Sequence, residues 1–267
     1  MMGKYKIVDA HCHIYPEKIA EKAVAGTDAF YSTGAACKGT VADLIAEGAK
    51  AGIDHFLVHS VATTPAQVRS INEFIARAVD SSGGSMTGFG ALHPDSSDIK
   101  GDIEHLTALG LKGVKLHPDI QQFAIDEDRC QEIYRICENK LPILMHTGDY
   151  RYDYSNPNRL LPVLQSYPGL TVIGAHFGGW SVYEEACDKL AGIPNLYVDC
   201  SSSMYYLSDE QTKQIIRRYG AGRVLFGSDF PMWSPSAEIR KLMALGLDEW
   251  EIECILYKNA QKLLELE

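Results

Sequence analysis

The stretch Val8-Asp9-Ala10-His11-Cys12-His13 is a short apolar segment that ends in two histidines. Side chains at positions i and i+2 of a β-strand point to the same face, so this pattern predicts a strand on which His11 and His13 share a face. Two neutral imidazoles placed in this way can bind one divalent cation, provided that further ligands come from elsewhere in the chain. The alternative interpretation of the motif alone is a pair of ordinary histidines at a strand end.

Seven further apolar stretches follow, and most of them end in polar residues. They lie at 53–59, 86–93, 113–117, 142–146, 170–176, 195–200 and 223–229. From the second of the eight stretches onward, their starts recur about every 25 to 33 residues, which is the spacing of a strand followed by a helix. Eight such units predict an α/β fold of the (β/α)8 TIM-barrel type.

The segments between these strands show the apolar spacing of helices. Thr40 is predicted to cap a helix that ends at Lys50, and Thr64 and Pro65 are predicted to open the next one. Further helices are predicted at 98–109, 126–139, 158–166, 181–190, 208–219 and 236–245, with terminal helices over 248–264. Only 14–39 lacks a clear pattern, and it is predicted to form a loop beside the active site.

Length and composition fit one barrel domain over residues 1–267. The net charge of −10 argues against nucleic acid or an acidic membrane surface as a partner, because clustered Lys and Arg are missing. No stretch resembles a signal peptide or a membrane-spanning helix, so we expect a cytoplasmic protein. The seven cysteines are scattered, and we expect them to be reduced and mostly buried.

Polar residues that can bind metals or protons follow most of the predicted strands. In a barrel of this type the carboxyl ends of the strands meet around one axis, so residues that are distant in sequence converge there. This set comprises His11, His13, His59, His93, His117, His146, His176 and Asp229. For Asp229 the structural alternative is a cap on the following helix, and for His59 and His93 we expect hydrogen bonds at the barrel mouth.

Several motifs occur in order along the whole chain. They are DAHCHIYP at 9–16, GVKLHP at 113–118, MHTG at 145–148, GAHFGG at 174–179, LFGSDFP at 225–231 and YKNAQKLL at 257–264. Together they resemble the amidohydrolase superfamily, and within it the amidohydrolase 2 branch. That branch includes aminocarboxymuconate-semialdehyde decarboxylase, resorcylate decarboxylases and lactone hydrolases of aromatic breakdown. The resemblance is specific for the fold and much less so for the substrate.

The resemblance implies that His11, His13, His146 and Asp229 bind one divalent metal, with His176 beside it as a catalytic acid or base. Such an ion lowers the pKa of bound water from about 15.7 to roughly 7. Asp229 is then also catalytic, because it can accept the proton of the attacking water. The imidazole-rich set favours Zn²⁺, with Mn²⁺ as the alternative.

Lys115 and His117 share one face of the fourth strand, so both are predicted to point into the barrel. In binuclear members of the superfamily a carboxylated lysine at this position bridges two metals, but the KLHP form favours one metal. We therefore predict that Lys115 and His117 bind substrate, with a salt bridge inside the barrel as the structural alternative for the lysine. Arg151 is predicted to clamp a substrate carboxylate, and Trp180 to contact the substrate.

These features predict a metal-dependent hydrolase that acts on an amide, lactone or related C–N or C–O bond of a small carboxylated molecule. The first alternative is non-oxidative decarboxylation of an aromatic or muconate-like acid, for which the same ligands would serve. A catalytically inactive barrel that only binds a ligand is the alternative of a different class. The expected partner is the small substrate, and a homodimer is the alternative to a monomer.

Overall fold

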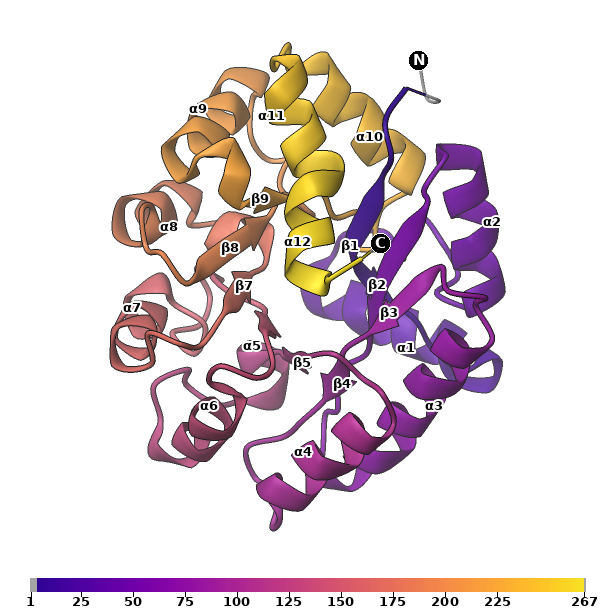
Figure 1. Ribbon diagram of the computed structural model, residues 1–267, viewed down its shortest axis with the longest axis vertical. Helices are drawn as coiled ribbons and strands as arrows, with labels where there is room; N and C mark the ends of the chain where they lie inside the picture. The colour runs from indigo at the N-terminus through magenta and orange to yellow at the C-terminus, as the bar shows by residue number, and fades with distance from the viewer. Residues whose placement is uncertain (1–3, 267) are drawn as a thin grey trace.

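The computed structural model describes residues 4–266, in which parallel strands alternate with helices (Figure 1). The strands are β1 (Val8–His13), β2 (His55–His59), β3 (Met86–Gly88), β4 (Gly90–Ala91), β5 (Val114–Leu116), β6 (Ile143–Met145), β7 (Val172–Gly174), β8 (Leu196–Asp199) and β9 (Val224–Leu225). The helices before residue 140 are α1 (Glu17–Tyr31), α2 (Val41–Ala51), α3 (Val68–Asp80), α4 (Ile99–Ala108), α5 (Pro118–Gln121) and α6 (Gln131–Cys137). The later ones are α7 (Pro157–Ser166), α8 (Tyr183–Leu190), α9 (Asp209–Tyr219), α10 (Pro235–Ala244), α11 (Glu249–Glu253) and α12 (Asn259–Leu264).

The strands form a closed parallel barrel. They are hydrogen-bonded in the order β1-β2-β3 and β4-β5-β6-β7-β8-β9. Phe89 joins β3 to β4, which are two parts of one predicted strand, and its N–H donates to the carbonyl oxygen of Val58 at 2.9 Å. The last strand meets the first where the N–H of Ala10 donates to the carbonyl oxygen of Phe226 at 2.8 Å. The predicted α/β barrel is thus confirmed.

The barrel interior is apolar at the amino ends of the strands. The inward-facing cluster consists of Val8, Ala10, Leu57, Phe89, Leu144, Ile173, Ala175, Tyr197, Leu225 and Ala260. Leu263, Leu264 and Leu266 pack against this cluster, so that α12 closes the amino-terminal mouth, as its position over the strands in Figure 1 shows. Burial of these side chains contributes to the driving force for folding, together with the larger apolar cluster of the chain.

A bulge in β1 directs the two histidines inward. The register between β1 and β2 shifts between Asp9 and Cys12. Val8 and Ala10 face the inner apolar cluster before this shift, and His11 and His13 face the barrel interior after it. A bulge inserts one extra residue and so reverses the alternation of side chains. One short strand therefore contributes side chains both to the inner apolar cluster and to the pair of histidines.

The predicted helix starts are largely confirmed. The Oγ1 of Thr40 accepts a hydrogen bond from the N–H of Asp43, and Asp98 and Ser208 cap α4 and α9 in the same way. The terminal helices predicted over 248–264 are α11 and α12, and a π-helical turn at Cys254–Lys258 connects them. All seven cysteines are free. Within residues 4–266, no helix combines the length and the apolar character that a membrane span requires.

The prediction of a loop at 14–39 is wrong, because α1 occupies more than half of this segment. Only Ala20 and Val24 of this helix are fully buried, so its apolar stripe is narrow and gives a weak periodic signal. The helix ends at Tyr31, and Ser32 follows in the left-handed conformation. It thereby carries side chains to the carboxyl-terminal mouth of the barrel, where the candidate site lies.

Asn72 holds the interrupted third strand in place. Its buried side chain donates from Nδ2 to the carbonyl oxygen of Ala91 at 3.1 Å and accepts from the N–H of Ala91 at 2.7 Å. We expect Asn72→Ala to lower the free energy of unfolding by about 3 kcal/mol, because it leaves two buried backbone groups without partners. Urea unfolding measures this, and Ser70→Ala on the exposed face of α3 is the control. An Asn72→Ala protein as stable as the control would contradict the role of this contact.

Glu238 on α10 gives stability a defined dependence on pH. It is fully buried, and burial raises the pKa of its carboxyl from 4.5 to about 8. Between these values the folded protein keeps a proton that the unfolded chain has released, so stability falls as pH rises. We expect Glu238→Gln, which mimics the protonated form, to match the wild type near pH 4.5 and to exceed its unfolding free energy increasingly towards pH 8. Denaturant unfolding across this range checks it, and a constant difference between the two proteins would refute it.

Candidate metal centre

The predicted site residues meet at the carboxyl ends of the strands. His11 and His13 end β1, His117 follows β5, His146 follows β6, and His176 and Asp229 lie beyond β7 and β9. Apart from the half-buried His13, all of them are buried. The site therefore excludes most bulk water, which strengthens the electrostatic interactions within it.

His11, His13 and Asp229 form the tightest group. The Nε2 atoms of the two histidines are 3.3 Å apart, and each lies 3.4 Å from Oδ1 of Asp229. Two ligands that each lie about 2.1 Å from a tetrahedral cation are separated by roughly 3.4 Å. The spacing of these three atoms therefore fits the binding of one ion.

Asp199, at the end of β8, fixes the orientation of His11. The Nδ1–H of His11 donates to Oδ2 of Asp199 at 2.9 Å, which leaves Nε2 with a lone pair that faces the site. Burial alone would raise the pKa of Asp199, but His11, His176 and the hydroxyl of Ser201 together lower it to about 2. A histidine whose second nitrogen donates to a carboxylate is the usual arrangement of a metal ligand.

His146 and His176 present two further bare nitrogens. The Nδ1–H of His176 donates to the carbonyl oxygen of Ser201 at 3.0 Å, and the Nε2–H of His146 donates to that of Gly148 at 3.1 Å. Carbonyl oxygens only accept, so these contacts place the ring protons and leave Nε2 of His176 and Nδ1 of His146 unprotonated. Those two atoms are 3.2 Å apart. Facing lone pairs repel each other, and a shared cation or proton would relieve the repulsion.

Lys115 reaches into the same space from β5. Its side chain is 1% exposed, and Nζ lies 3.2 Å from Nε2 of His11. Burial lowers its pKa to about 8, although the charges of Asp229 and Asp199 act in the opposite direction. The lysine thus faces the barrel interior, as predicted from its alternation with His117.

His59 does not form the hydrogen bonds that we expected at the barrel mouth. Within residues 4–266, neither of its ring nitrogens has a hydrogen-bond partner. Its ring packs edge-on against those of His13 and His11, with centroids 4.4 and 4.9 Å apart. The prediction failed because the rings of His11 and His13 pack against this ring. Burial also holds the pKa of His59 well below its usual value. His93 does form a hydrogen bond, since its Nδ1 accepts from the N–H of Asp95.

The residues predicted to bind substrate lie around the histidines. Trp180 is 8% exposed and packs edge-on against the ring of Tyr31, with centroids 5.0 Å apart. Arg151 directs Nε and Nη2 at the carboxylate of Asp149 at 2.9 and 2.7 Å, and Nη1 at the carbonyl oxygen of Phe30. In this conformation all of these guanidinium nitrogens bind groups of the protein itself. Bidentate binding of a substrate carboxylate by Arg151 stays a prediction.

Three residues at the site were missed by the sequence analysis. Asp199 carried a usable signal, because it ends a predicted strand as the histidines do. Tyr31 carried none, since it lies on the unpredicted helix α1, and its hydroxyl is 3.0 Å from Nε2 of His117. Ser202 donates to Oδ2 of Asp229 at 2.5 Å, and a serine after a strand gives no pattern to read.

The backbone adopts the left-handed conformation at three site residues. His176, Ser202 and Asp229 have φ of 58°, 50° and 56°. For residues other than glycine this costs roughly 1–2 kcal/mol each. The neighbouring Gly227 leaves room for His11, because a Cβ at this position would lie 2.9 Å from the Cβ of His11. The fold thus accepts strain at positions that direct side chains into the site.

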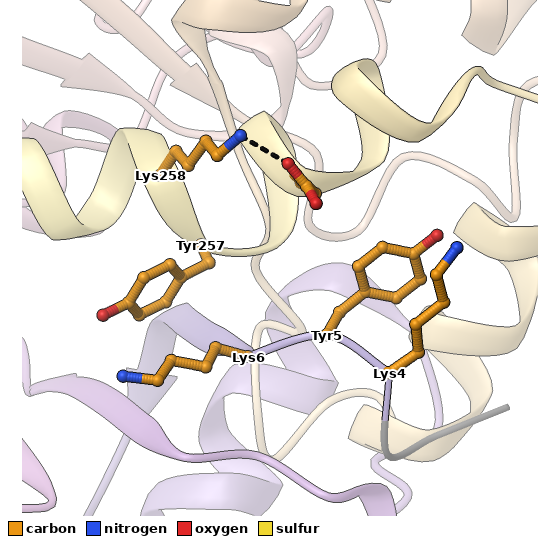
Figure 2. A pocket seen from close by; sticks show the side chains of 6 residues that line it. Lys4, Tyr5, Lys6, Tyr257 and Lys258 are labelled. Carbon is orange, nitrogen blue, oxygen red and sulfur yellow. Dashed lines mark hydrogen bonds and ion pairs between the residues drawn. The ribbon is translucent and has the colours of Figure 1, made fainter.

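A separate pocket lies at the amino-terminal end of β1, away from these residues (Figure 2). It is lined by Lys4, Tyr5, Lys6, Glu253, Tyr257 and Lys258. Lys4 pairs with Glu249 at 2.6 Å, Lys258 pairs with Glu253, and the ammonium of Lys6 lies 5.2 Å from the centre of the Tyr257 ring. Its lysines are thus engaged with neighbouring side chains, and the chemistry described above lies at the other end of the barrel.

Comparison with protein families identifies the chain. The family model described as amidohydrolase matches residues 8–266. The chain belongs to the amidohydrolase family. This match confirms the resemblance to the amidohydrolases that the sequence motifs indicated. No curated protein sequence matches it significantly.

Solved structures share the fold of this amidohydrolase. A TIM-barrel protein from Bordetella bronchiseptica has a TM-score of 0.81 and 23% identity, covering 98% of this chain and 99% of its own. A 5-carboxyvanillate decarboxylase from Sphingomonas paucimobilis has a TM-score of 0.77 and 14% identity, with 99% and 100% coverage. The enzyme of that name from Novosphingobium aromaticivorans, complexed with manganese and 4-hydroxy-3-methoxy-5-nitrobenzoic acid, has a TM-score of 0.74 and 16% identity, with 98% and 97% coverage. At these identities the likeness establishes the barrel fold alone.

The contact between Asp199 and His11 gives a prediction for metal affinity. We expect Asp199→Asn to weaken the binding of zinc or manganese about 10- to 100-fold, because the amide no longer holds the proton on Nδ1 of His11. Calorimetric titration of the metal-free protein measures this affinity. Asp80→Asn, the same change at an exposed position on α3, is the control. Equal affinities in the two variants would show that Asp199 does not orient the ligand.

Proposed function

We propose that this amidohydrolase is a divalent-metal-dependent hydrolase that cleaves an amide, lactone or related bond of a small carboxylated molecule. One observation carries the proposal: the bare Nε2 of His11, Nε2 of His13 and Oδ1 of Asp229 lie within 3.4 Å of one another. Two imidazole nitrogens and a carboxylate oxygen at these distances have the spacing of ligands to one cation. The set offers two imidazoles and a carboxylate, which suits a divalent ion.

His11, His13, His146 and Asp229 would hold the ion. When bound, it would supply Lewis-acid activation of water and of the substrate carbonyl at neutral pH. The share of imidazole favours zinc, and the manganese in the structure from Novosphingobium aromaticivorans makes that metal the second choice. The fit rests on the donor set, because Asp199 and the carbonyl of Gly148 keep the site-facing nitrogens of His11 and His146 free of protons.

Asp229 is placed to accept the proton of the attacking water. Burial would raise its pKa, but His11, His13 and His176 lower it well below the ordinary range, so the group is ionised at neutral pH. Ser202 donates to its Oδ2, which leaves Oδ1 facing the histidines. Because the serine holds the carboxylate in one orientation, Oδ1 can accept a proton without a prior rotation of the side chain.

His176 is placed to deliver a proton to the leaving group. Its Nδ1–H is committed to the carbonyl oxygen of Ser201, so proton exchange takes place at Nε2. Burial lowers its pKa from the ordinary 6.5, and the ring is therefore neutral before the reaction begins. It can take up the proton that Asp229 accepts and then donate it, which is the two-way role expected of a general acid and base.

The environment of the site suits a substrate that carries a carboxylate. Lys115 brings an ammonium group into the interior, and its charge would be balanced by a carboxylate of the substrate. Trp180, Tyr206 and Trp233 lie in the loops after β7, β8 and β9, and they offer apolar surface to a planar molecule. We infer a small carboxylated substrate, with an aromatic or unsaturated ring as the best match.

Non-oxidative decarboxylation is the second candidate. It is favoured by the aromatic side chains and by the two structural neighbours that are 5-carboxyvanillate decarboxylases. In that reaction Asp229 or His176 would protonate the carbon that loses carbon dioxide. A panel of lactones, amides and hydroxybenzoates, assayed with added zinc or manganese, separates the candidates. Hydrolysis releases acid without gas, whereas decarboxylation releases carbon dioxide.

Removal of the metal and of the proton carriers tests catalysis itself. With the best substrate of the panel, we expect a chelator to abolish turnover and added metal to restore it. We expect Asp229→Asn and His176→Asn each to lower kcat about 10²- to 10⁴-fold, which is the usual contribution of general acid–base groups. Steady-state kinetics measure these changes. His105→Asn on α4, outside the site, is the matched control.

The two variants together can overturn the assigned roles. Full turnover in both would show that neither Asp229 nor His176 carries the proton. No turnover by the wild type with any substrate of the panel would favour the inactive, ligand-binding barrel that the sequence left open. Loss of turnover in the variants, together with activity that survives chelation, would instead point to chemistry that these residues perform without a metal.

A further inference from the structure

Tyr31 extends from the last turn of α1 into the mouth of the barrel. Its hydroxyl oxygen lies 3.0 Å from Nε2 of His117 and 3.2 Å from Nε2 of His146. The ring is held in place by Trp180 and by Phe30, whose ring centroid is 4.8 Å away. The phenol is thus fixed beside two of the strand-end histidines.

Both histidine nitrogens that face this hydroxyl carry a proton. The Nδ1 of His117 accepts the N–H of Ile120 at the start of α5, so the proton of its neutral ring is on Nε2. The Nε2 of His146 carries its proton as well, because it faces the carbonyl oxygen of Gly148.

The proton of the Tyr31 hydroxyl therefore has no acceptor among these two histidines. A phenolic oxygen has two lone pairs and one proton. The Nε2–H of His117 donates to one lone pair, and the Nε2–H of His146 is shared between this hydroxyl and the carbonyl oxygen of Gly148. Neither imidazole nitrogen can accept the remaining proton. Among residues 4–266, the hydroxyl makes no hydrogen bond beyond these two. A donor without an acceptor in a mostly buried position is costly unless a bound molecule supplies the acceptor.

We propose that Tyr31 binds the substrate directly, by donating its hydroxyl proton to a carboxylate or carbonyl oxygen of the bound molecule. The inference deepens the proposed function, on which it rests, by naming a recognition group on a helix outside the strand-end motifs. The acceptor must be an oxygen on the side of the substrate that faces His117 and His146. A carboxylate suits the position best, because a hydrogen bond to a charged oxygen is stronger than one to a neutral oxygen.

Arg151 helps to place this group. Its guanidinium carbon lies 5.4 Å from the centre of the Tyr31 ring, and its Nη1 donates to the carbonyl oxygen of Phe30 at 2.7 Å. The ion pair with Asp149 anchors the arginine to the loop after β6. The arginine therefore links this loop to the end of α1, and it holds the tyrosine at the mouth of the barrel.

The test compares Tyr31→Phe with Tyr152→Phe. Both changes remove one hydroxyl from a ring that stays in place, and Tyr152 stacks on Phe30 away from the histidines. The probe is 4-hydroxy-3-methoxy-5-nitrobenzoic acid, which carries a carboxylate and absorbs visible light. Its Kd is measured by absorbance with manganese-loaded and with metal-free protein, and manganese uptake is titrated separately. Thermal unfolding confirms that each variant is folded.

We expect Tyr31→Phe to raise the Kd of the probe about tenfold, which corresponds to the loss of one hydrogen bond. Manganese uptake should not change, and Tyr152→Phe should bind the probe as the wild type does. Equal Kd values for wild type and Tyr31→Phe would overturn the inference, as would a wild type that does not bind the probe. Failure of the wild type to take up manganese would refute the proposed function instead, and the metal-free titrations would still decide the role of Tyr31.

Discussion

The structure depends on holding several unprotonated acceptors together inside a closed barrel. The lone pairs of His11, His146 and His176 face the interior together with Oδ1 of Asp229, and they repel one another. Groups outside this set keep the arrangement in place, since Asp199 and the carbonyl oxygens of Gly148 and Ser201 bind the ring protons on the far side. The repulsion that remains would be relieved by a bound cation.

The barrel divides its interior into two chemical layers. The amino-terminal layer is apolar and is closed by α12, whereas the carboxyl-terminal layer is formed by histidines, carboxylates and Lys115. Local departures from regular strand geometry connect the layers. The bulge in β1 and the left-handed residues His176 and Asp229 redirect side chains that regular alternation would point elsewhere. The free energy of the backbone strain at these positions is offset by the burial of the apolar layer.

The helix α1 gives the site a wall that the strands alone do not provide. Tyr31, Trp180 and Arg151 pack on one another where α1 meets the loops after β6 and β7. The metal ligands proposed for this site would serve hydrolysis and decarboxylation alike. We therefore expect the residues that select the substrate to lie in such walls and loops rather than in the barrel itself. The strand-end residues would supply the chemistry common to both reactions, and the wall would determine the substrate of this amidohydrolase.

The sequence by itself determined the barrel and most members of the site. The spacing of apolar stretches predicts eight parallel strands, and the polar residues that end them predict which side chains converge, because strand ends meet by topology alone. The tertiary structure decided what local patterns do not encode. It placed Tyr31 through a helix with a narrow apolar stripe, left His59 without hydrogen bonds, and engaged Arg151 with Asp149. It also fixed which ring nitrogen carries the proton in His11, His117, His146 and His176, because that depends on partners as distant in sequence as Asp199 is from His11.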